Sequence, residues 1–209
     1  MKNKVETFNR YTDLTALIDI LSKKRMVLLD PSSWDDQNDV HFMAYYKKKR
    51  TLNSLLALCF TSKYETYHHW SVFAPNSSGV CIKYKRNELK NCFTNVEGVK
   101  FKDVKYKQIT DLQCNDLALS DVPFLKRYPY KDEEEFRAIY ESDVIEFVKE
   151  IHFDVSIIDC IVLSPWLPQP LVDTVKQTIQ GIDGCEELKV YKTTLLSNSN
   201  WKNALKKLV

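Results

Sequence analysis

Three consecutive glutamates precede an arginine in the segment Asp132–Arg137, which reads Asp-Glu-Glu-Glu-Phe-Arg. The run that starts there is aromatic and β-prone, so we expect a strand, in which side chains alternate between two faces. Glu133, Glu135 and Arg137 would then project together, and Glu134 would point away. Like charges in proximity raise a carboxyl pKa and an arginine lowers one, so the two glutamates could take different roles in acid–base chemistry. The alternative is a solvated acidic turn before an edge strand.

Arg10 belongs to a second segment that could bind a ligand. It lies in Asn9-Arg10-Tyr11-Thr12, at the predicted end of a strand and directly before a predicted helix start. A guanidinium at such a place can bind a phosphate or a ribose through its planar donors. The alternative is a surface arginine beside a helix N-cap.

An aromatic segment, Tyr67–Ala74, is the third candidate. On a helix, Trp70 and Phe73 would share one face and could form a shelf for a flat ring, with the Ser71 hydroxyl as a polar contact nearby. A stripe of this kind also packs well in a protein core. The two adjacent histidines of the segment diverge on a helix and no carboxylate accompanies them, so we expect no metal.

Small polar residues surround Trp34 in the segment Ser32–Asp39, a pattern typical of a turn with a helix cap. A nuclease that uses Mg²⁺ would instead combine the carboxylates of this segment with those of the acidic run. The residues concerned are Asp35, Asp36, Asp39, Glu133 and Glu135.

The composition of the 209 residues, with 44% hydrophobic and 12% aromatic residues, predicts a folded domain with a full core. Only four glycines occur, which excludes a P-loop and a glycine-rich dinucleotide fingerprint. The formal charge of +2 is too balanced to indicate nucleic acid by bulk electrostatics. The lysine-rich strands expected between Lys83 and Lys107 nevertheless favour nucleic acid mildly over protein as a macromolecular partner.

Six scattered cysteines show no spacing that suits zinc. Three of them lie in apolar runs and are predicted to be small core residues, namely Cys59, Cys81 and Cys160. The segment Met1–Glu6 lacks the apolar core of a signal peptide, and no stretch approaches the length of a membrane span. We therefore expect a cytoplasmic protein without a membrane partner.

Apolar periodicity predicts short strands interleaved with few, short helices. The expected strands are Phe8–Tyr11, Arg25–Leu29, Ser54–Thr61, Val80–Tyr84, Val99–Tyr106, Phe136–Tyr140, Ile157–Leu163 and Leu188–Thr193. The expected helices begin after a cap at Thr12 or Asp13, fill the second half of Trp34–Arg50, and cover Tyr64–Ala74, Thr110–Asp121 and Leu171–Ile179. This pattern indicates a mixed, mostly antiparallel α+β domain over residues 1–209.

Taken in order, these segments resemble a bacterial family, the domain of unknown function numbered twenty-nine seventy-one. Phe8–Tyr11 matches its opening hydrophobic-basic-tyrosine strand, and Trp34–Gln37 fits a following loop without the family's proline. Trp70–Ala74 and Gly79–Cys81 match its aromatic and Gly-x-Cys motifs, with phenylalanine for tyrosine. Glu133–Arg137 matches its Glu-x-Glu-Tyr-Arg ending. The resemblance covers about residues 8–165, and a helix and strand extension follows.

The layout of that family is similar in turn to the ADP-ribosyltransferase fold. This resemblance implies a split β-sheet with short flanking helices that binds NAD as a substrate, without a glycine-rich loop and without a metal. It implies that Glu135 stabilises charge at the nicotinamide ribose and that Glu133 orients or deprotonates the acceptor. NAD would be bound by Arg10, Tyr11, Trp70, Ser71 and Phe73, with Arg137 supporting the glutamates.

The function implied is that of a mono-ADP-ribosyltransferase, an effector of phage defence or a toxin of a toxin–antitoxin pair. Its acceptor would be RNA, DNA or protein, and a neutralising antitoxin would be a further partner. The alternative is a module on the same fold that binds a nucleotide, a nucleic acid or a protein without catalysis. The missing proline near Trp34 and the phenylalanine at Phe73 favour that alternative.

Overall fold

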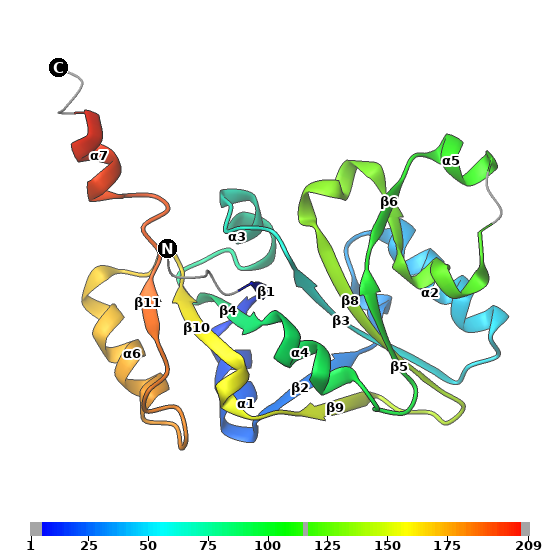
Figure 1. Cartoon of the computed structure of the whole chain (residues 1–209), viewed down its shortest axis with the longest axis horizontal. Helices are drawn as coiled ribbons and strands as arrows, with labels where there is room; N and C mark the ends of the chain where they lie inside the picture. The colour runs from blue at the N-terminus through cyan, green and yellow to red at the C-terminus, as the bar shows by residue number, and fades with distance from the viewer. Residues whose placement is uncertain (1–5, 115–116, 206–209) are drawn as a thin grey trace.

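The computed structural model describes residues 6–114 and 117–205, which form an α+β fold around one mixed sheet (Figure 1). Its strands are β1 (Thr7–Asp13), β2 (Arg25–Leu29), β3 (Ser54–Thr61), β4 (Gly79–Lys85), β5 (Val99–Asp103), β6 (Lys105–Lys107), β7 (Leu125–Arg127), β8 (Glu135–Ser142), β9 (Val148–His152), β10 (Ile158–Leu163) and β11 (Val190–Lys192). Its α-helices are α1 (Leu14–Lys23), α2 (Gln37–Lys49), α3 (Tyr67–Phe73), α4 (Arg86–Phe93), α5 (Ile109–Cys114), α6 (Val172–Gln180) and α7 (Ser199–Leu205). Short 3-10 helices include η1 (Pro31–Ser33), η2 (Leu119–Phe124) and η3 (Tyr128–Glu133).

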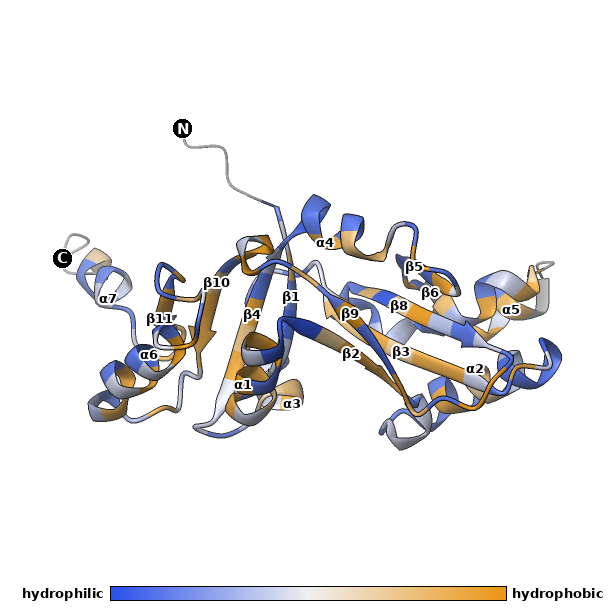
Figure 2. Ribbon diagram, turned by 90° about the horizontal axis from the view of Figure 1, so that it is seen from below, coloured by the Kyte–Doolittle hydropathy of each residue, from blue (hydrophilic) through white to orange (hydrophobic). Residues whose placement is uncertain are grey.

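The main sheet runs in the order β11-β10-β4-β1-β3-β2-β9, with β8 and β5 added beside β3. All its pairings are antiparallel except β10 with β11. Strand β1 pairs with β4 along its whole length but meets β3 only at Asn9 and Thr61. The sheet is therefore split into a first wing, β11-β10-β4-β1, and a second wing made of β3, β8, β5, β2 and β9, which diverge in Figure 2. The predicted mostly antiparallel, split α+β fold is confirmed.

Alternation along β3 divides the interior into separate cores. Leu56, Leu58 and Phe60 join a large core that also holds apolar residues of α1, α4 and α6. Leu55 and Ala57, at the intervening positions, pack with residues of α2 in a second core. Helix α3 packs in a third core against residues of β4 and β10. Helices α2 and α3 thus belong to two smaller cores, one on each wing.

Capping residues fix where the helices near the split begin. The Asp13 side chain accepts a hydrogen bond from the Ala16 amide at 2.8 Å and starts α1, as expected from the sequence. The Asp36 side chain accepts from the Asn38 amide at 3.0 Å and starts α2. Thr66 caps α3 in the same way.

Several elements differ from the sequence prediction. The strand expected over 99–106 is divided into β5 and β6 at Val104, whose amide donates to the carbonyl of Glu135 at 2.8 Å. The helix expected over 110–121 is α5 followed by η2, and residues 115–116 lie outside the described part of the chain. Helix α4 and strands β7 and β9 were not predicted, because each is short and rich in charge.

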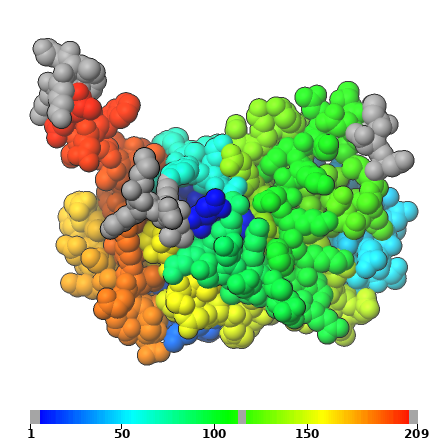
Figure 3. Space-filling view, viewed as in Figure 1, coloured from blue at the N-terminus to red at the C-terminus, as the bar shows by residue number. Residues whose placement is uncertain are grey.

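The chain beyond residue 165 adds to the first wing. Strand β11 joins the sheet beside β10, and α7 then extends away from the body of the molecule (Figures 1 and 3). Trp201 in α7 is 76% exposed. Within the described residues, no helix has both the length and the apolar character needed to cross a membrane.

Candidate active site

A cavity of about 490 Å³ opens where the two wings of the sheet separate. Helix α2 with the loop before it, helix α3, and the segment from β7 to β8 contribute residues to its walls. Six of the eight residues that the resemblance to ADP-ribosyltransferases implies line it, namely Arg10, Tyr11, Phe73, Glu133, Glu135 and Arg137.

The split explains why neighbours on β1 line one cavity. Arg10 and Tyr11 are consecutive, so their side chains leave opposite faces of the strand. Both line the cavity because β1 and β3 separate beyond their single register pair. The Arg10 guanidinium donates to the carbonyl of Cys59 on β3 at 3.4 Å. No carboxylate in residues 6–114 or 117–205 forms an ion pair with Arg10.

Arg137 is the fixed centre of the charged groups in the cavity, and its side chain is fully buried. Its Nε and Nη2 atoms donate to Oε1 and Oε2 of Glu135 at 2.7 and 3.0 Å. Its Nη1 and Nη2 atoms donate to Oδ1 and Oδ2 of Asp39 at 2.9 and 2.6 Å. The Trp34 ring lies 4.8 Å from the guanidinium. Paired donors in a rigid fork hold both carboxylates in place.

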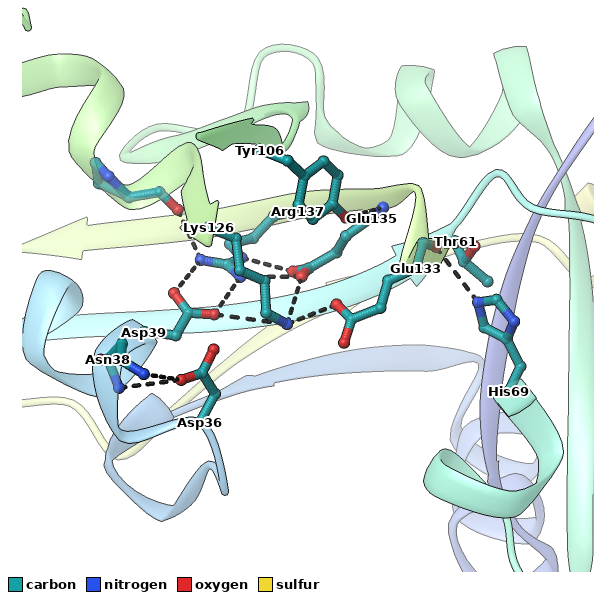
Figure 4. A network of polar contacts seen from close by, with 11 residues as sticks. Asp36, Asn38, Asp39, Thr61, His69, Tyr106, Lys126, Glu133, Glu135 and Arg137 are labelled. Carbon is teal, nitrogen blue, oxygen red and sulfur yellow. Dashed lines mark hydrogen bonds and ion pairs between the residues drawn. The ribbon is translucent and has the colours of Figure 1, made fainter. Parts of the chain in front are cut away.

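Lys126 on β7 connects the two glutamates (Figure 4). Its Nζ atom lies 2.6 Å from Oε2 of Glu133 and 3.3 Å from Oε2 of Glu135. It also lies 3.9 Å from Oδ2 of Asp39. The ammonium therefore contacts every carboxylate of the cluster formed by Asp39, Lys126, Glu133, Glu135 and Arg137, which we call the charged cluster.

The two glutamates of the charged cluster differ in pKa. Burial raises the pKa of Glu135, but the charges of Arg137 and Lys126 outweigh it and lower that pKa to about 2. Burial raises the pKa of Glu133, and Lys126 offsets that effect only in part. The sequence led us to expect that the two pKa values differ, but the main cause of the raised pKa of Glu133 is burial rather than repulsion from Glu135.

Glu133 and Glu135 lie on one side of the segment and Glu134 on the other, as predicted, but not through a continuous strand. Glu133 ends η3, and Glu134 has a left-handed conformation with φ 43° before β8 begins. The Glu134 side chain is exposed and pairs with Lys63. A left-handed residue thus returns the chain to the same side that strand alternation would have given.

His69 lines the cavity, although no pattern in the sequence selected it as a residue of an NAD site. Its Nδ1 atom lies 2.6 Å from Oγ1 of Thr66, and its Nε2 atom lies 3.4 Å from the carbonyl oxygen of Glu133. Burial lowers the pKa of His69, which favours the neutral form of the imidazole. The Tyr11 ring stacks on it with centroids 5.4 Å apart.

Trp70 and Ser71 are not among the residues that line the cavity. Trp70 is fully buried, and its Nε1 atom donates to Oε1 of Glu65 at 2.7 Å. Phe73 lines the cavity and is 42% exposed. The expectation that Trp70 and Phe73 form one shelf was wrong, because a separation of three residues leaves side chains about 60° apart around a helix. Here that angle separates the core from the rim of the cavity.

The acidic residues of the α2 segment have different surroundings. Both oxygens of Asp39 accept hydrogen bonds from Arg137, and Asp36 caps α2. Among the described residues, no group of three or more His, Cys, Asp or Glu side chains is arranged to hold a metal ion. Cys59 also lines the cavity and is only partly buried, so its assignment to the core was wrong, whereas Cys81 and Cys160 are buried as expected.

No protein-family model and no curated protein matches the chain, so its resemblance to the family of unknown function is not confirmed. Among solved structures, the chain is similar to Thermus sp. 2.9 DarT in complex with ADP-ribosylated ssDNA. The TM-score is 0.47 and the identity is 8%, over 90% of this chain and 94% of that one. So low a TM-score carries no inference about function, which is therefore inferred from the geometry of the site itself.

Proposed function

We propose that the chain is an NAD-dependent mono-ADP-ribosyltransferase that modifies a macromolecule, as an effector of phage defence or as the toxin of a toxin–antitoxin pair. One observation carries the proposal. A fixed, ionised carboxylate, that of Glu135, lines the same cavity as Arg10, an arginine without a carboxylate partner in the described chain. This combination suits a substrate that carries phosphates close to a bond whose cleavage builds positive charge.

The cavity has properties that suit NAD. Its volume of about 490 Å³ lies within the range of roughly 300 to 1,000 Å³ that is usual for small-molecule sites. Arg10 is partly buried, and withdrawing a guanidinium from water without an anion is costly, so a diphosphate at Arg10 would supply a missing partner. Tyr11 and Phe73 add aromatic surface to the wall for a flat ring. Trp70 and Ser71 would support this wall from within α3.

The two glutamates would divide the chemistry between them. NAD supplies a ribose bonded to a positively charged nicotinamide, which leaves with the bonding electron pair. Glu135, ionised at neutral pH, would stabilise the positive charge that develops on the ribose. Glu133 would accept the proton that the acceptor loses as it bonds to the ribose carbon. Arg137 would keep Glu135 in position.

Nucleic acid is the acceptor that we favour. The lysines between Lys83 and Lys107 make this part of the surface basic, although three of them have carboxylate partners, since Lys105 lies 3.9 Å from Asp121. Lys100 pairs with Glu141 at 2.5 Å, and Lys102 pairs with Asp121 at 2.9 Å. Single-stranded nucleic acids bind surfaces that combine positive charge with aromatic rings.

The test is transfer of label from radioactive NAD to RNA, DNA or protein from a cell extract. We expect transfer by the wild-type protein and a loss of about 100-fold to 1,000-fold in Glu135→Gln, as is usual when an electrostatic contact to the transition state is removed. Glu134→Gln is the matched control, because the carboxylate of Glu134 is next to Glu135 in the sequence but is exposed and pairs with Lys63. Arg10→Met should raise the KM for NAD. Equal transfer by Glu135→Gln and the wild type would disprove the proposal.

A second candidate is the binding module, and one observation favours it. Both oxygens of Glu135 already accept bonds from Arg137 or Lys126, as they would in a purely structural ion pair. A binding module would take up NAD or a nucleotide in a calorimeter without releasing nicotinamide. Nicotinamide release by the wild type, absent in Glu135→Gln, would rule it out.

A further inference from the structure

Lys126 occupies a rigid position at the centre of the charged cluster. Its neighbours Phe124 and Leu125 are 1% and 2% exposed and anchor the backbone, and β7 pairs in parallel with β6. The Lys126 side chain is 10% exposed, and its ammonium lies 4.9 Å from the centre of the Tyr130 ring. The anchored backbone and the contact with Tyr130 therefore hold the ammonium where Figure 4 places it, between Glu133 and Glu135.

Charged and titratable groups from several elements face Glu133, but Lys126 is the cation in direct contact with it in the described chain. The Arg137 guanidinium bonds to Glu135 and Asp39 instead. The other titratable groups near Glu133 are Glu135 from β8 and Tyr106 from β6, whose charges interact with its carboxyl group. His69 from α3 contacts the main-chain carbonyl of Glu133, and Asp39 from α2 contacts the same Lys126 ammonium. Of these, the carboxylates repel a second negative charge, and burial favours the neutral form of the imidazole.

We propose that Lys126 is a positioning residue that keeps Glu133 ionised and fixed as the proton acceptor of the transfer step. This inference rests on the proposed function. In that step a nucleophilic oxygen or nitrogen of the acceptor bonds to the ribose carbon, and the bond from that carbon to the nicotinamide nitrogen breaks. The electron pair of the broken bond leaves with nicotinamide, and the proton of the nucleophile goes to Glu133.

Lys126 itself exchanges no proton in this scheme. Burial lowers its pKa, but the carboxylates of Glu135 and Glu133 raise that pKa above its ordinary value, so the ammonium keeps its charge through the neutral range. Without that charge, only the weaker effect of the more distant Arg137 would oppose burial and the negative charge of Glu135 at Glu133. Glu133 would then be protonated at a higher pH and could not accept the proton of the nucleophile.

The first experiment needs no substrate. The pKa of Glu133 is measured by NMR of ¹³C-labelled glutamate side chains, with the signal assigned through Glu133→Gln. Removing a cation at contact distance in Lys126→Met should raise that pKa by about 1 to 3. Lys126→Arg should leave it near the wild-type value. Lys131→Met is the control, because Lys131 is exposed and bonds to the Tyr128 hydroxyl. An unchanged pKa in folded Lys126→Met would overturn the inference.

A second variant covers the case in which Lys126→Met does not fold. In Glu135→Gln, Lys126 keeps its contact with Glu133 while the repulsion from Glu135 is lost. The pKa of Glu133 should therefore fall, and a rise would overturn the inference.

The second experiment measures kcat/KM for the transfer as a function of pH. Since a base must be ionised, a higher pKa of Glu133 moves the acid limb of the profile to higher pH by the same amount. We expect this in Lys126→Met, with return to the wild-type limb in Lys126→Arg and no change in Lys131→Met. If Lys126→Met instead loses rate equally at all pH values, the substitution has disturbed only the structure of the site, and this result would contradict the inference. Absence of transfer by the wild type would overturn the proposed function and the base role of Glu133, whereas the NMR result would stand.

Discussion

At the scale of residues, the charged cluster contributes both to the stability of the fold and to the proposed chemistry. The Arg137 guanidinium is fully buried, and two carboxylates share its donors. Such an arrangement is costly to break, because removing one partner leaves an uncompensated buried charge. Asp39 is therefore expected to matter for folding as well as for the position of Glu135.

We predict that Asp39→Asn lowers the free energy of unfolding by about 3 to 5 kcal/mol, the usual cost of breaking a buried ion pair. Urea unfolding monitored by tryptophan fluorescence would measure it. Asp143→Asn is the control, because Asp143 is exposed and lies outside the charged cluster. A loss no larger in Asp39→Asn than in this control would contradict the prediction.

The lowered pKa of Glu135 predicts how the stability of the folded protein changes with pH. Its pKa is about 2 in the folded protein, compared with 4.5 for the free side chain. Ionised Glu135 therefore stabilises the folded state above pH 4.5, and this stabilisation is lost as the pH falls from 4.5 to 2. The loss is on the order of 3 kcal/mol from this group. Because Glu135→Gln lacks the group, the stability difference between wild type and variant should shrink by this amount over that range in urea titrations.

The sequence could predict only part of the site at this scale. The spacing of Glu133, Glu135 and Arg137 is local, and the structure places all three on the cavity. Asp39 lies 98 residues from the arginine that binds it, and a pairing at that distance leaves no local pattern. Lys126 gave no signal either, since a lysine in a short, charged strand normally lies at the surface.

At the scale of elements, Gly79 controls the approach of α3 to the sheet. A Cβ atom at this position would lie 2.3 Å from the carbonyl oxygen of Ala74, the residue that ends α3. Only glycine permits this contact between the turn and β4. The Gly-x-Cys motif thus has a structural explanation. Gly79 avoids a clash with Ala74 where β4 begins, and Cys81 is buried two residues further along the strand.

We predict that Gly79→Ala lowers the free energy of unfolding by about 1 to 3 kcal/mol, as overpacking usually does. Thermal unfolding would measure the change. Gly181→Ala is the matched control, since a Cβ atom there comes no closer than 3.3 Å to a carbonyl oxygen and the backbone φ is −79°. That substitution should therefore cost less stability than Gly79→Ala. Equal melting temperatures for Gly79→Ala and Gly181→Ala would contradict the prediction.

Elements with strong apolar periodicity were predictable, and elements built on charged residues were not. β3 is apolar along most of its length and lies where the sequence placed it. β9, which reads Val-Lys-Glu-Ile-His, has one fully buried side chain, Ile151, and is a strand because β2 pairs with it. Helix α4 keeps only Leu89 and Phe93 in the core. Tertiary contacts, rather than local preference, decide such elements.

At the scale of the whole molecule, the split of the sheet places the site. The resemblance drawn from the motifs implied a split sheet, but no pattern in the sequence showed that β1 and β3 would separate just beyond Asn9. That separation makes room for the cavity and brings Arg10 to its wall. The C-terminal α7, in contrast, extends away from the sheet in Figure 1, and none of its described residues is among those that line the cavity.

We predict that deleting residues 199–209 leaves the free energy of unfolding and the proposed activity unchanged within error. The hydrogen bonds that tie the start of α7 to the preceding chain are local, from Trp201 and Lys202 to Asn198 and from Lys202 to Ser197. Trp201 is largely exposed. Denaturant unfolding and NAD turnover of the shortened protein would test this, and a clear loss of either would show that α7 contributes to the fold or the site.

The split also has a consequence for motion. Beyond Asn9, the β1 amides that face the gap have no ladder partner on β3, so the two wings are joined there by side chains rather than by backbone hydrogen bonds. Arg10 belongs to the first wing and Glu135 to the second, so a ligand that contacts both would tie the wings together. Hydrogen–deuterium exchange near the gap should then slow on both wings at once when NAD binds.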